Sequence, residues 1–516
     1  KHVIPFGVCS LSIPVSIYSQ TSQHPNIIMF LVDDMGWQDT SVPFYNDELT
    51  PLNKRFHTPN MERMAQMGVR FTEAYACAIS SPTRCSLMSG MNASRHRVTN
   101  WTLELNEKTD ESSDVIALPE WNFNGIQPDS TEGKINNSTA ITSLPQILRE
   151  NGYWTIHCGK AHFGARTTPG ANPINMGFDV NIAGGANGAP GSYLGTKNFG
   201  EGSRFAVQGL EKYYGQDIFI TEALTREALT EMEKAVKMNK PFYLYMSHYA
   251  VHTPYDDDKR FSDKYRGKYD EQLKTGLNES EAKYAALVEG MDKSLGDILD
   301  YLQKNPEVAK NTILLFMSDN GGQGLGYIRQ GIPNHDQNYP ARGGKGSAFM
   351  GGVREPMMVY WPGVTKPNTE CDQRVIIEDF YPTILEMAGV KKYKTHQVVD
   401  GVSFADVLKH PETRKDRVLI WHFPNLWGES QNLKEGYGAY SAIMKGDYHL
   451  IYTWETRQLR LYNVKEDIGE QHDLAQAMPD KVKELAAELS DYLRERDAQR
   501  PSLKATGEVI PFPDGK

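Results

Sequence analysis

Three short apolar runs constrain the fold of this chain more than any other feature of its sequence. They cover residues 26–32, 242–246 and 312–317, and each passes abruptly into polar residues. Runs of this length without polar alternation are typical of strands that are buried on both faces of a sheet. Between them lie helical patterns at 60–67, 143–151 and 220–238. This alternation predicts an α/β fold, with a large, mostly parallel or mixed central sheet flanked by helices.

Polar residues gather where the apolar runs end. Asp33 and Asp34 follow the first run, Asp319 and Asn320 follow the third, and the second leads to His252. Because the carboxyl ends of parallel strands meet at one edge of an open sheet, we expect these side chains to lie close together. That edge is the predicted functional site.

The pattern of apolar segments and turns in the sequence changes near residue 410. Short segments separated by turns follow, at 418–424, 440–454 and 460–464, and they read as antiparallel strands. A charged amphipathic helix is predicted from Pro479 to about Arg496. Since 516 residues exceed what one small core needs, we predict two parts. A large domain over 22–410 would hold the site, and 411–516 would form an α+β subdomain of antiparallel sheet plus helix.

The N-terminal segment, 1–21, has the pattern of a secretory signal. One Lys precedes a mostly apolar stretch from Val3 to Tyr18, which resembles the apolar core of a signal peptide. An ordinary N-terminal arm is the alternative. Elsewhere no run approaches the roughly 20 apolar residues that a membrane span requires, so no span is expected. Five scattered cysteines without a CxxC pair indicate neither a disulfide framework nor a zinc cluster.

The charge of the chain argues against nucleic acid as a partner. Its formal net charge is −10, and it holds no dense run of Lys and Arg. An anionic substrate would therefore have to be attracted by a local positive site rather than by the overall field.

The segment 78–90, AISSPTRCSLMSG, says most about chemistry. Its residues read first as a helix start, with Ser80 as a cap and Pro82 in the first turn. A helix N-terminus offers unpaired N–H groups and a positive field, which suits an anionic substrate. Taken alone, the pattern S-x-P-x-R is a weak functional signal.

The same segment resembles the maturation signature of the type I sulfatases, in which Cys or Ser is followed by x-Pro-x-Arg and then Gly. The resemblance implies an alkaline-phosphatase-like superfold and a sulfuric ester hydrolase. It implies that a maturing enzyme oxidises Ser80 to formylglycine in the unfolded chain, and that the hydrated aldehyde supplies the attacking oxygen. Serine at this position resembles the bacterial members and implies export, for example to the periplasm. Cys85 falls on a variable position and is interpreted as a small buried side chain.

Further family segments extend the resemblance from residue 26 to about residue 475. The acids after the first run and the D-N-G after the third match the family's paired acidic segments. Hard oxygen ligands suit Ca²⁺. The resemblance therefore implies a calcium site formed by Asp33, Asp34, Ser80, Asp319 and Asn320.

The catalytic residues are implied by the maturation signature and by three other matching segments, GKAHFG, AVHTP and GGKG. Asp319 is the expected base for the attacking hydroxyl. His252, assisted by Lys345, is expected to protonate the departing sugar oxygen, and His162 to accept the proton whose loss expels sulfate. The full implied set is Ser80, Arg84, Lys160, His162, His252 and Lys345.

Four residues that lie in or beside these segments are predicted to contact the substrate: Trp101, His335, Asp336 and Arg354. The stretch 421–427 is similar to one in bacterial carbohydrate sulfatases that act on galactose or N-acetylgalactosamine sulfates. The predicted substrate is accordingly a sulfated sugar or oligosaccharide of this kind, from a host or algal glycan.

Three alternatives remain open on the sequence. An arylsulfatase would differ only in the loops around the pocket. A phosphatase or phosphonate hydrolase of the same superfold would usually lack Pro-x-Arg after its nucleophile and would favour His-rich zinc ligands. A binding protein for sulfated glycans would require that Ser80 is never oxidised.

Overall fold

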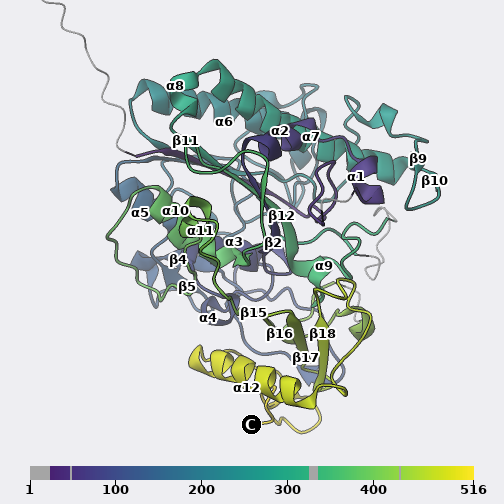
Figure 1. The fold of residues 1–516 in the computed structure, drawn as a ribbon. Helices are drawn as coiled ribbons and strands as arrows, with labels where there is room; N and C mark the ends of the chain where they lie inside the picture. The colour runs from purple at the N-terminus through teal and green to yellow at the C-terminus, as the bar shows by residue number, and fades with distance from the viewer. Residues whose placement is uncertain (1–23, 47–48, 325–334, 429–431) are drawn as a thin grey trace, which may run out of the picture.

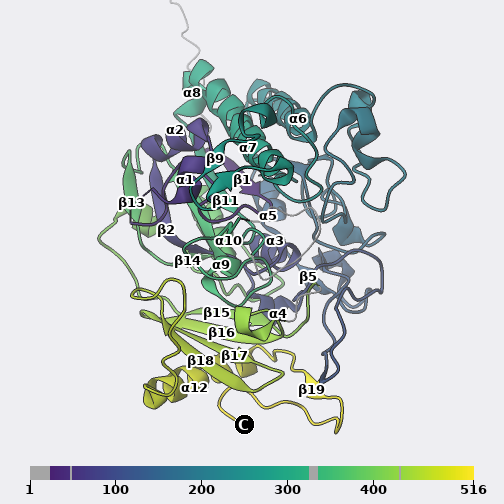
Figure 2. The same ribbon diagram turned by 90° about the vertical axis from the view of Figure 1, so that its right-hand side faces the viewer.

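The computed structural model describes residues 24–516, apart from 47–48, 325–334 and 429–431. Within these residues a nine-stranded mixed sheet forms the centre of the molecule (Figures 1 and 2). In their order across the sheet, the strands are β13 (Thr369–Cys371), β2 (Val69–Tyr75), β12 (Arg354–Tyr360), β11 (Thr312–Ser318), β1 (Asn26–Val32), β8 (Phe242–Ser247), β6 (Trp154–Gly159) and β7 (Val180–Ile182), with β14 (Val375–Ile376) paired to β2.

The parallel strands at the centre of the sheet finish together at one edge. Val32 pairs with Ser318, and both Leu31 and Gly159 pair with Ser247. Every residue of β1, β8 and β11 is buried, which explains why these strands are continuous apolar runs in the sequence. The loops that follow β1, β6, β8 and β11 therefore start side by side.

Helices cover both faces of the sheet (Figure 1). One face carries α2 (Pro59–Met67), α6 (Ile220–Lys237) and α7 (Glu279–Lys304), and the other carries α3 (Ser80–Ser89), α5 (Leu144–Glu150) and α10 (Phe380–Met387). The remaining short elements are α1 (Pro51–Arg55), α4 (Ala93–His96), α8 (Pro306–Ala309), α9 (Met350–Val353), α11 (Ala405–Lys409), β3 (Ile116–Ala117), β4 (Ile126–Pro128), β5 (Thr139–Ile141), β9 (Tyr269–Asp270), β10 (Thr275–Gly276) and β19 (Ser502–Leu503).

Helix α3 is the element that positions the maturation segment. It spans Ser80–Ser89, so Ser80 is its first residue and not the predicted cap, which is Ile79. Gly90 follows as the C-cap, and its φ of 69° is a left-handed conformation that glycine adopts without strain. All ten of its residues are buried. Its N-terminus is therefore held rigidly at the edge where the central strands finish.

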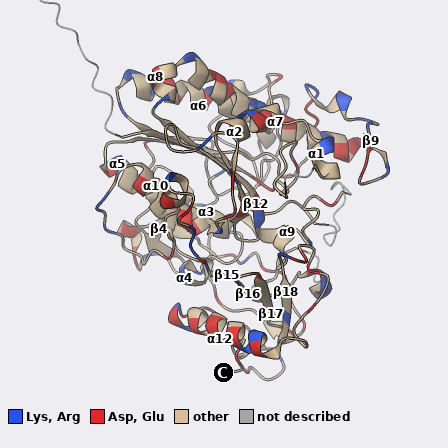
Figure 3. Ribbon diagram, viewed as in Figure 1, with Lys and Arg blue, Asp and Glu red and all other residues tan. Residues whose placement is uncertain are grey.

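The C-terminal part has its own sheet, of which one face packs into the main core through residues such as Trp421 and Met444, while the other face belongs to a second core cluster. Strands β15 (Leu419–Phe423), β16 (Tyr440–Lys445), β17 (Tyr448–Thr453) and β18 (Gln458–Asn463) form an antiparallel sheet in that order. Helix α12 (Pro479–Glu495) packs on this sheet through Leu485, Leu489 and Leu493. Acidic and basic residues are interspersed along this helix (Figure 3).

The predicted α/β architecture is confirmed, and the sheet is of the mixed kind because β12 runs antiparallel to β11 and β2. The predicted helices at 60–67, 143–151 and 220–238 match α2, α5 and α6 within one residue at each end. The predicted signal segment, 1–21, lies outside the described residues, so export stays a prediction. Among the helices that are described, none combines the length and the apolar character that crossing a bilayer would need.

Candidate active site

Ser80 stands at the centre of the site, as the first residue of α3. Its Oγ lies 2.9 Å from Lys160 Nζ, and 3.2 Å from both Asp33 Oδ1 and Asn320 Oδ1. The residue is 3 % exposed. A side-chain oxygen at a helix N-terminus, touched by an ammonium group, lies in a positive field that favours an anionic ligand.

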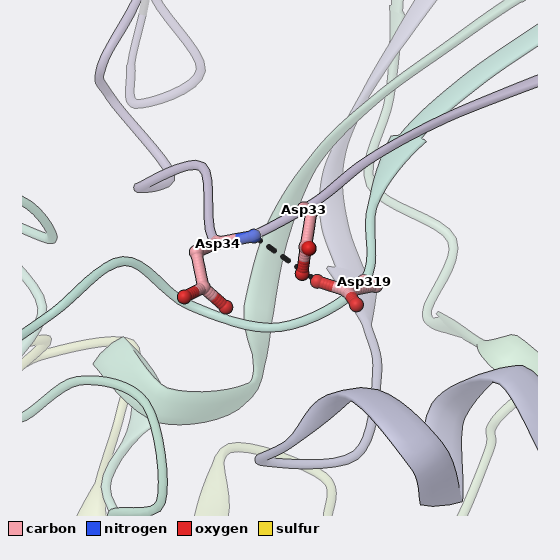
Figure 4. A group of neighbouring side chains, drawn as sticks. All are labelled: Asp33, Asp34 and Asp319. Atoms are coloured by element: carbon pink, nitrogen blue, oxygen red, sulfur yellow. Dashed lines mark hydrogen bonds between the residues drawn. The ribbon is translucent and has the colours of Figure 1, made fainter. Parts of the chain in front are cut away.

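The strand-end acids converge as the sequence predicts (Figure 4). Carboxylate oxygens of Asp33, Asp34 and Asp319 all lie within 4.8 Å of one another, and the three side chains are buried. The backbone N–H of Asp34 donates to Asp319 Oδ1 at 3.1 Å, which joins the β1 loop to the β11 loop. Asp34 has a φ of 61°. Aspartate tolerates this left-handed conformation better than most residues do, and strained backbone of this kind is typical of functional loops.

Three fixed cations face these three carboxylates. Lys160 Nζ donates to both oxygens of Asp33 at 2.8 Å, and Lys345 Nζ donates to Asp34 Oδ1 at 2.6 Å. Arg84 holds Asp319 Oδ2 through Nη2 at 2.8 Å and Nε at 3.1 Å. The site is thus balanced in charge as built, and a divalent cation would make it positive.

The pKa shifts follow from burial and from these partners. Burial raises the pKa of Asp33 to about 8, because desolvation of its carboxylate outweighs the attraction of Lys160. Burial also lowers the pKa of Lys160 to about 8. For Asp34 the effect of burial is overcome by Lys345 and His252, which hold its pKa below the ordinary value.

The donor set fits Ca²⁺. Carboxylate oxygens of three aspartates lie within 4.8 Å of one another, and the Ser80 oxygen lies 3.2 Å from both Asp33 Oδ1 and the amide oxygen of Asn320. Calcium takes six to eight hard oxygen ligands. Asp33, Asp34, Asp319 and Asn320, together with the oxygen of residue 80, would hold the ion, as the resemblance implied.

His252 and His162 flank the cluster in neutral form. His252 Nε2 lies 3.6 Å from Asp34 Oδ2, while its Nδ1 lies 2.8 Å from the carbonyl of Thr253. Burial lowers the pKa of His252 to about 3, and Lys345 and Lys160 add to this effect. His162 Nε2 donates to the Thr102 carbonyl at 2.8 Å, and burial holds the pKa of this ring well below its usual value.

The pocket above the cluster has a volume of ≈ 870 Å³. Ser80, His162, His252 and Lys345 line its floor, so the catalytic residues implied by the resemblance open onto one cavity, except for Arg84 and Lys160, which are fully buried beneath it. The Gly-rich loop at 188–191 forms part of the wall. A Cβ at Gly188 would lie 2.5 Å from the His162 ring, so this loop covers His162 closely.

Of the predicted substrate contacts, the structure places only Trp101 in this pocket. His335 is buried elsewhere, 2.7 Å from Glu281 and 3.3 Å from Asp39. Asp336 follows it, and its N–H donates to Gln272 Oε1. Arg354 donates to the carbonyl of Thr72 and stacks over Trp37. Closeness in sequence to the matched segments misled the prediction, because His335, Asp336 and Arg354 make their contacts with residues outside the pocket.

Other residues escaped the sequence reasoning. The hydroxyl of Ser247 accepts from Arg84 Nη1, Gln323 Nε2 donates to Asp34 Oδ2 at 3.1 Å, and Trp427 lines the pocket from the C-terminal part. The contacts of Ser247 and Gln323 join positions 163 and 289 residues apart, and no local pattern marks them. Trp427 lies in the stretch 421–427 that the sequence had already linked to carbohydrate sulfatases. The interpretation of Cys85 is confirmed: the residue is buried, and burial raises the pKa of its thiol.

Fold and site together describe an α/β protein with a buried serine at a helix N-terminus and a cluster of three carboxylates that could hold a cation. Residues 25–390 match the Sulfatase family model, and residues 345–499 match the model of the C-terminal region of N-sulphoglucosamine sulphohydrolase. The chain belongs to the sulfatase family, and it is a sulfuric ester hydrolase.

Relatives and a solved structure agree with this assignment. A sulfatase from Formosa agariphila is 28% identical over 99% of this chain and 97% of its own length. The N-acetylgalactosamine-6-sulfatase of Mus musculus is 30% identical over 78% of this chain and 69% of its own. The crystal structure of Ps i-CgsB in complex with k-i-k-neocarrahexaose is similar with a TM-score of 0.67 and 25% identity, covering 92% of this chain and 94% of that one.

Proposed function

We propose that this sulfatase removes sulfate from a sugar, a galactose or N-acetylgalactosamine sulfate of a glycan, with Ser80 oxidised to formylglycine and Ca²⁺ bound beside it. One observation carries the proposal: the Ser80 oxygen lies within 3.2 Å of Asp33, Asn320 and Lys160 at the floor of an open pocket. The relative named an N-acetylgalactosamine-6-sulfatase and the neighbour solved in complex with k-i-k-neocarrahexaose support the choice of a carbohydrate.

The two added groups have defined chemical roles, because formylglycine supplies a hydroxyl nucleophile and Ca²⁺ polarises the sulfate oxygens. The chain then has to orient residue 80 and accept its proton. Lys160 contacts the Ser80 oxygen directly and fixes its position. Asp33 is the carboxylate in hydrogen-bond contact with residue 80, while Asp319 is engaged by Arg84. The geometry therefore favours Asp33 over Asp319 as the proton acceptor.

Proton delivery to the leaving oxygen falls to Lys345 and His252. Lys345 stays protonated, because Asp34 and the other aspartates raise its pKa despite burial. The His252 ring is neutral in the free protein, and the negative charge of a bound sulfate ester would raise its pKa. Both side chains line the pocket and contact Asp34, so the leaving group would meet them together.

Release of sulfate requires a base that accepts the proton of the second hydroxyl of residue 80. His162 fits this role, because its Nε2 is used by the Thr102 carbonyl and its buried Nδ1 has no hydrogen-bond partner among the described residues. A neutral ring with an acceptor nitrogen can take up a proton during the reaction.

The test combines an assay of sulfate release with a mass measurement of the peptide that contains Ser80. A panel of sulfated monosaccharides and one aryl sulfate would be assayed for sulfate release, and the mass of the Ser80 peptide measured in the same preparation. We expect a peptide lighter by two hydrogens and turnover of one galactose or N-acetylgalactosamine regioisomer. Ser80→Ala should lower kcat/KM by at least about 10³-fold, whereas Ser130→Ala, at an exposed position, should not.

The outcomes separate the alternatives. Modified protein that cleaves only the aryl sulfate would make this an arylsulfatase. Modified protein that cleaves no member of the panel would contradict the monosaccharide substrate. Full activity with an unmodified Ser80 would contradict the formylglycine mechanism.

A further inference from the structure

Two loops that carry tryptophans into the pocket are joined by one carboxylate. Asn100 Nδ2 donates to Asp110 Oδ1 at 2.8 Å, and Asn425 Nδ2 donates to the same oxygen at 2.9 Å. Asn100 directly precedes Trp101, and Asn425 stands two residues before Trp427. Asp110 thus connects a wall of the large domain to a wall supplied by the C-terminal part.

Further hydrogen bonds make this junction specific. The Leu426 carbonyl accepts from Asn100 Nδ2 at 3.3 Å and from the backbone N–H of Glu111 at 3.1 Å. The second oxygen of Asp110 accepts from Trp121 Nε1 at 2.6 Å. Asn100 is fully buried, as is Asn425. Two buried amide groups that donate to a single carboxylate hold their loops in one arrangement, since breaking either bond would leave a buried N–H group unpaired.

Trp427 also abuts the turn that carries Lys345. Lys345 Nζ lies 5.5 Å from the centroid of the Trp427 ring. Gly346 has a φ of 86°, and a Cβ at this position would lie 2.5 Å from Trp427 Cε3. The ring is therefore seated against glycine backbone, beside the ammonium group that would meet the leaving oxygen.

We propose that Trp101 and Trp427 form an aromatic subsite for the saccharide ring that bears the sulfate, and that Asp110 is the positioning residue that sets both walls. This inference rests on the proposed function. Both side chains are partly exposed and line the same ≈ 870 Å³ cavity as Ser80. The C–H faces of a sugar are apolar, and an aromatic ring covers such a face while the hydroxyls stay free for hydrogen bonds.

The experiment compares N-acetylgalactosamine 6-sulfate with p-nitrophenyl sulfate in the full-length, modified protein. Stacking is present in both the bound substrate and the transition state, so its loss raises KM and leaves kcat less changed. We expect Trp427→Ala and Asp110→Ala each to raise KM for the sugar sulfate about 10-fold, with a smaller rise for the aryl sulfate. Trp427→Phe, which keeps a flat ring, should recover most of the loss.

Matched controls are Trp361→Phe, a partly exposed tryptophan outside the pocket, and Glu107→Gln, an exposed acid on the loop that carries Asp110. Neither should change KM. Thermal melting would show whether each variant is folded. If Asp110→Ala does not fold, the tryptophan variants still test the subsite independently.

Several results would overturn the subsite. An equal fall of kcat on both substrates would mean that Trp427 acts only through Lys345, and an unchanged KM would mean that no ring stacks there. Turnover of the aryl sulfate without the sugar sulfate would overturn the saccharide assignment while leaving a sulfatase. A modified parent protein that cleaves neither substrate would instead mark the failure of the proposed function, and the subsite would fall with it.

Discussion

At the scale of single residues, the site works by pairing each carboxylate with its own cation. Lys160 serves Asp33, Arg84 serves Asp319 and Lys345 serves Asp34. Of these cations, Lys345 is the one that also lines the pocket. It can therefore turn from its aspartate to a substrate oxygen, whereas Arg84 and Lys160 are enclosed on all sides.

Replacing Lys345 tests this division of roles. Lys345→Met keeps most of the side-chain volume but removes the charge that stabilises the leaving oxygen, so kcat should fall about 10²–10³-fold. Steady-state kinetics on the sugar sulfate measure this change. Lys293→Met, at an exposed position of α7 where the side chain pairs with Asp297, is the control. A variant that retains full kcat would exclude Lys345 from proton delivery.

At the scale of elements, the site depends on how neighbouring loops are tied to the helices behind them. His335 illustrates this tie, because it links the loop before β12 to α7 through Glu281 and to the β1 loop through Asp39. Arg55, at the end of α1, completes the cluster by binding Glu281 and Asp270. The side chains of these five residues are all buried. We therefore interpret the cluster, called the brace below, as a structural tie between loops and helices and not as a substrate contact.

The brace predicts a pH dependence of stability. Burial opposes the charged ring, but Asp39 and Glu281 raise the pKa of His335 above its unfolded value. Its stabilisation is therefore fully present below the unfolded pKa of about 6.5 and is lost as pH rises through the higher folded pKa.

Chemical denaturation checks this expectation. His335→Gln should lower the free energy of unfolding by about 1–3 kcal/mol near pH 6. The difference in free energy of unfolding between parent and variant should shrink toward pH 9, as His335 of the folded parent loses its proton. His410→Gln, at a mostly exposed histidine, should show no such trend. A difference that grows with pH would contradict the sign of the shift.

At the scale of the whole molecule, two sheets that share part of one core also share one pocket. The large sheet supplies the cluster, and the C-terminal sheet, with its core around Trp454 and α12, supplies Trp427. The cation site lies where the β1 and β11 loops meet, so an ion bound there would stabilise the contact between loops that are far apart in sequence.

Calcium should therefore raise the melting temperature. At about 100 times its Kd, a ligand that binds only the folded state adds about 2.7 kcal/mol, which corresponds to a rise of a few degrees. Differential scanning calorimetry with calcium and with a chelator measures it. Asp319→Asn should lose most of the effect, and Asp300→Asn, on the surface of α7, should keep it. Identical melting in both conditions would contradict a calcium site.

Much of the fold and site could be predicted because the carrying signals are local. A strand buried on both faces has to be a continuous apolar run, so the apolar runs predicted β1 and β11. The residues that follow each run must lie at the end of that strand, so the runs also predicted where the acidic residues after them would lie. The maturation segment likewise holds its own helix start, at Ser80, and its own stop, at Gly90.

The sequence by itself thus determined the α/β sheet and the positions of the loops that follow its central strands. It also indicated that Ser80 and the acidic cluster make up the candidate site. Only the tertiary structure decided which carboxylate touches Ser80, that His335 and Arg354 turn away from the pocket, and that Trp427 enters it. These outcomes depend on contacts between positions hundreds of residues apart, such as Asn425 with Asp110. Such contacts are set by strand order and packing, and local sequence patterns carry no record of them.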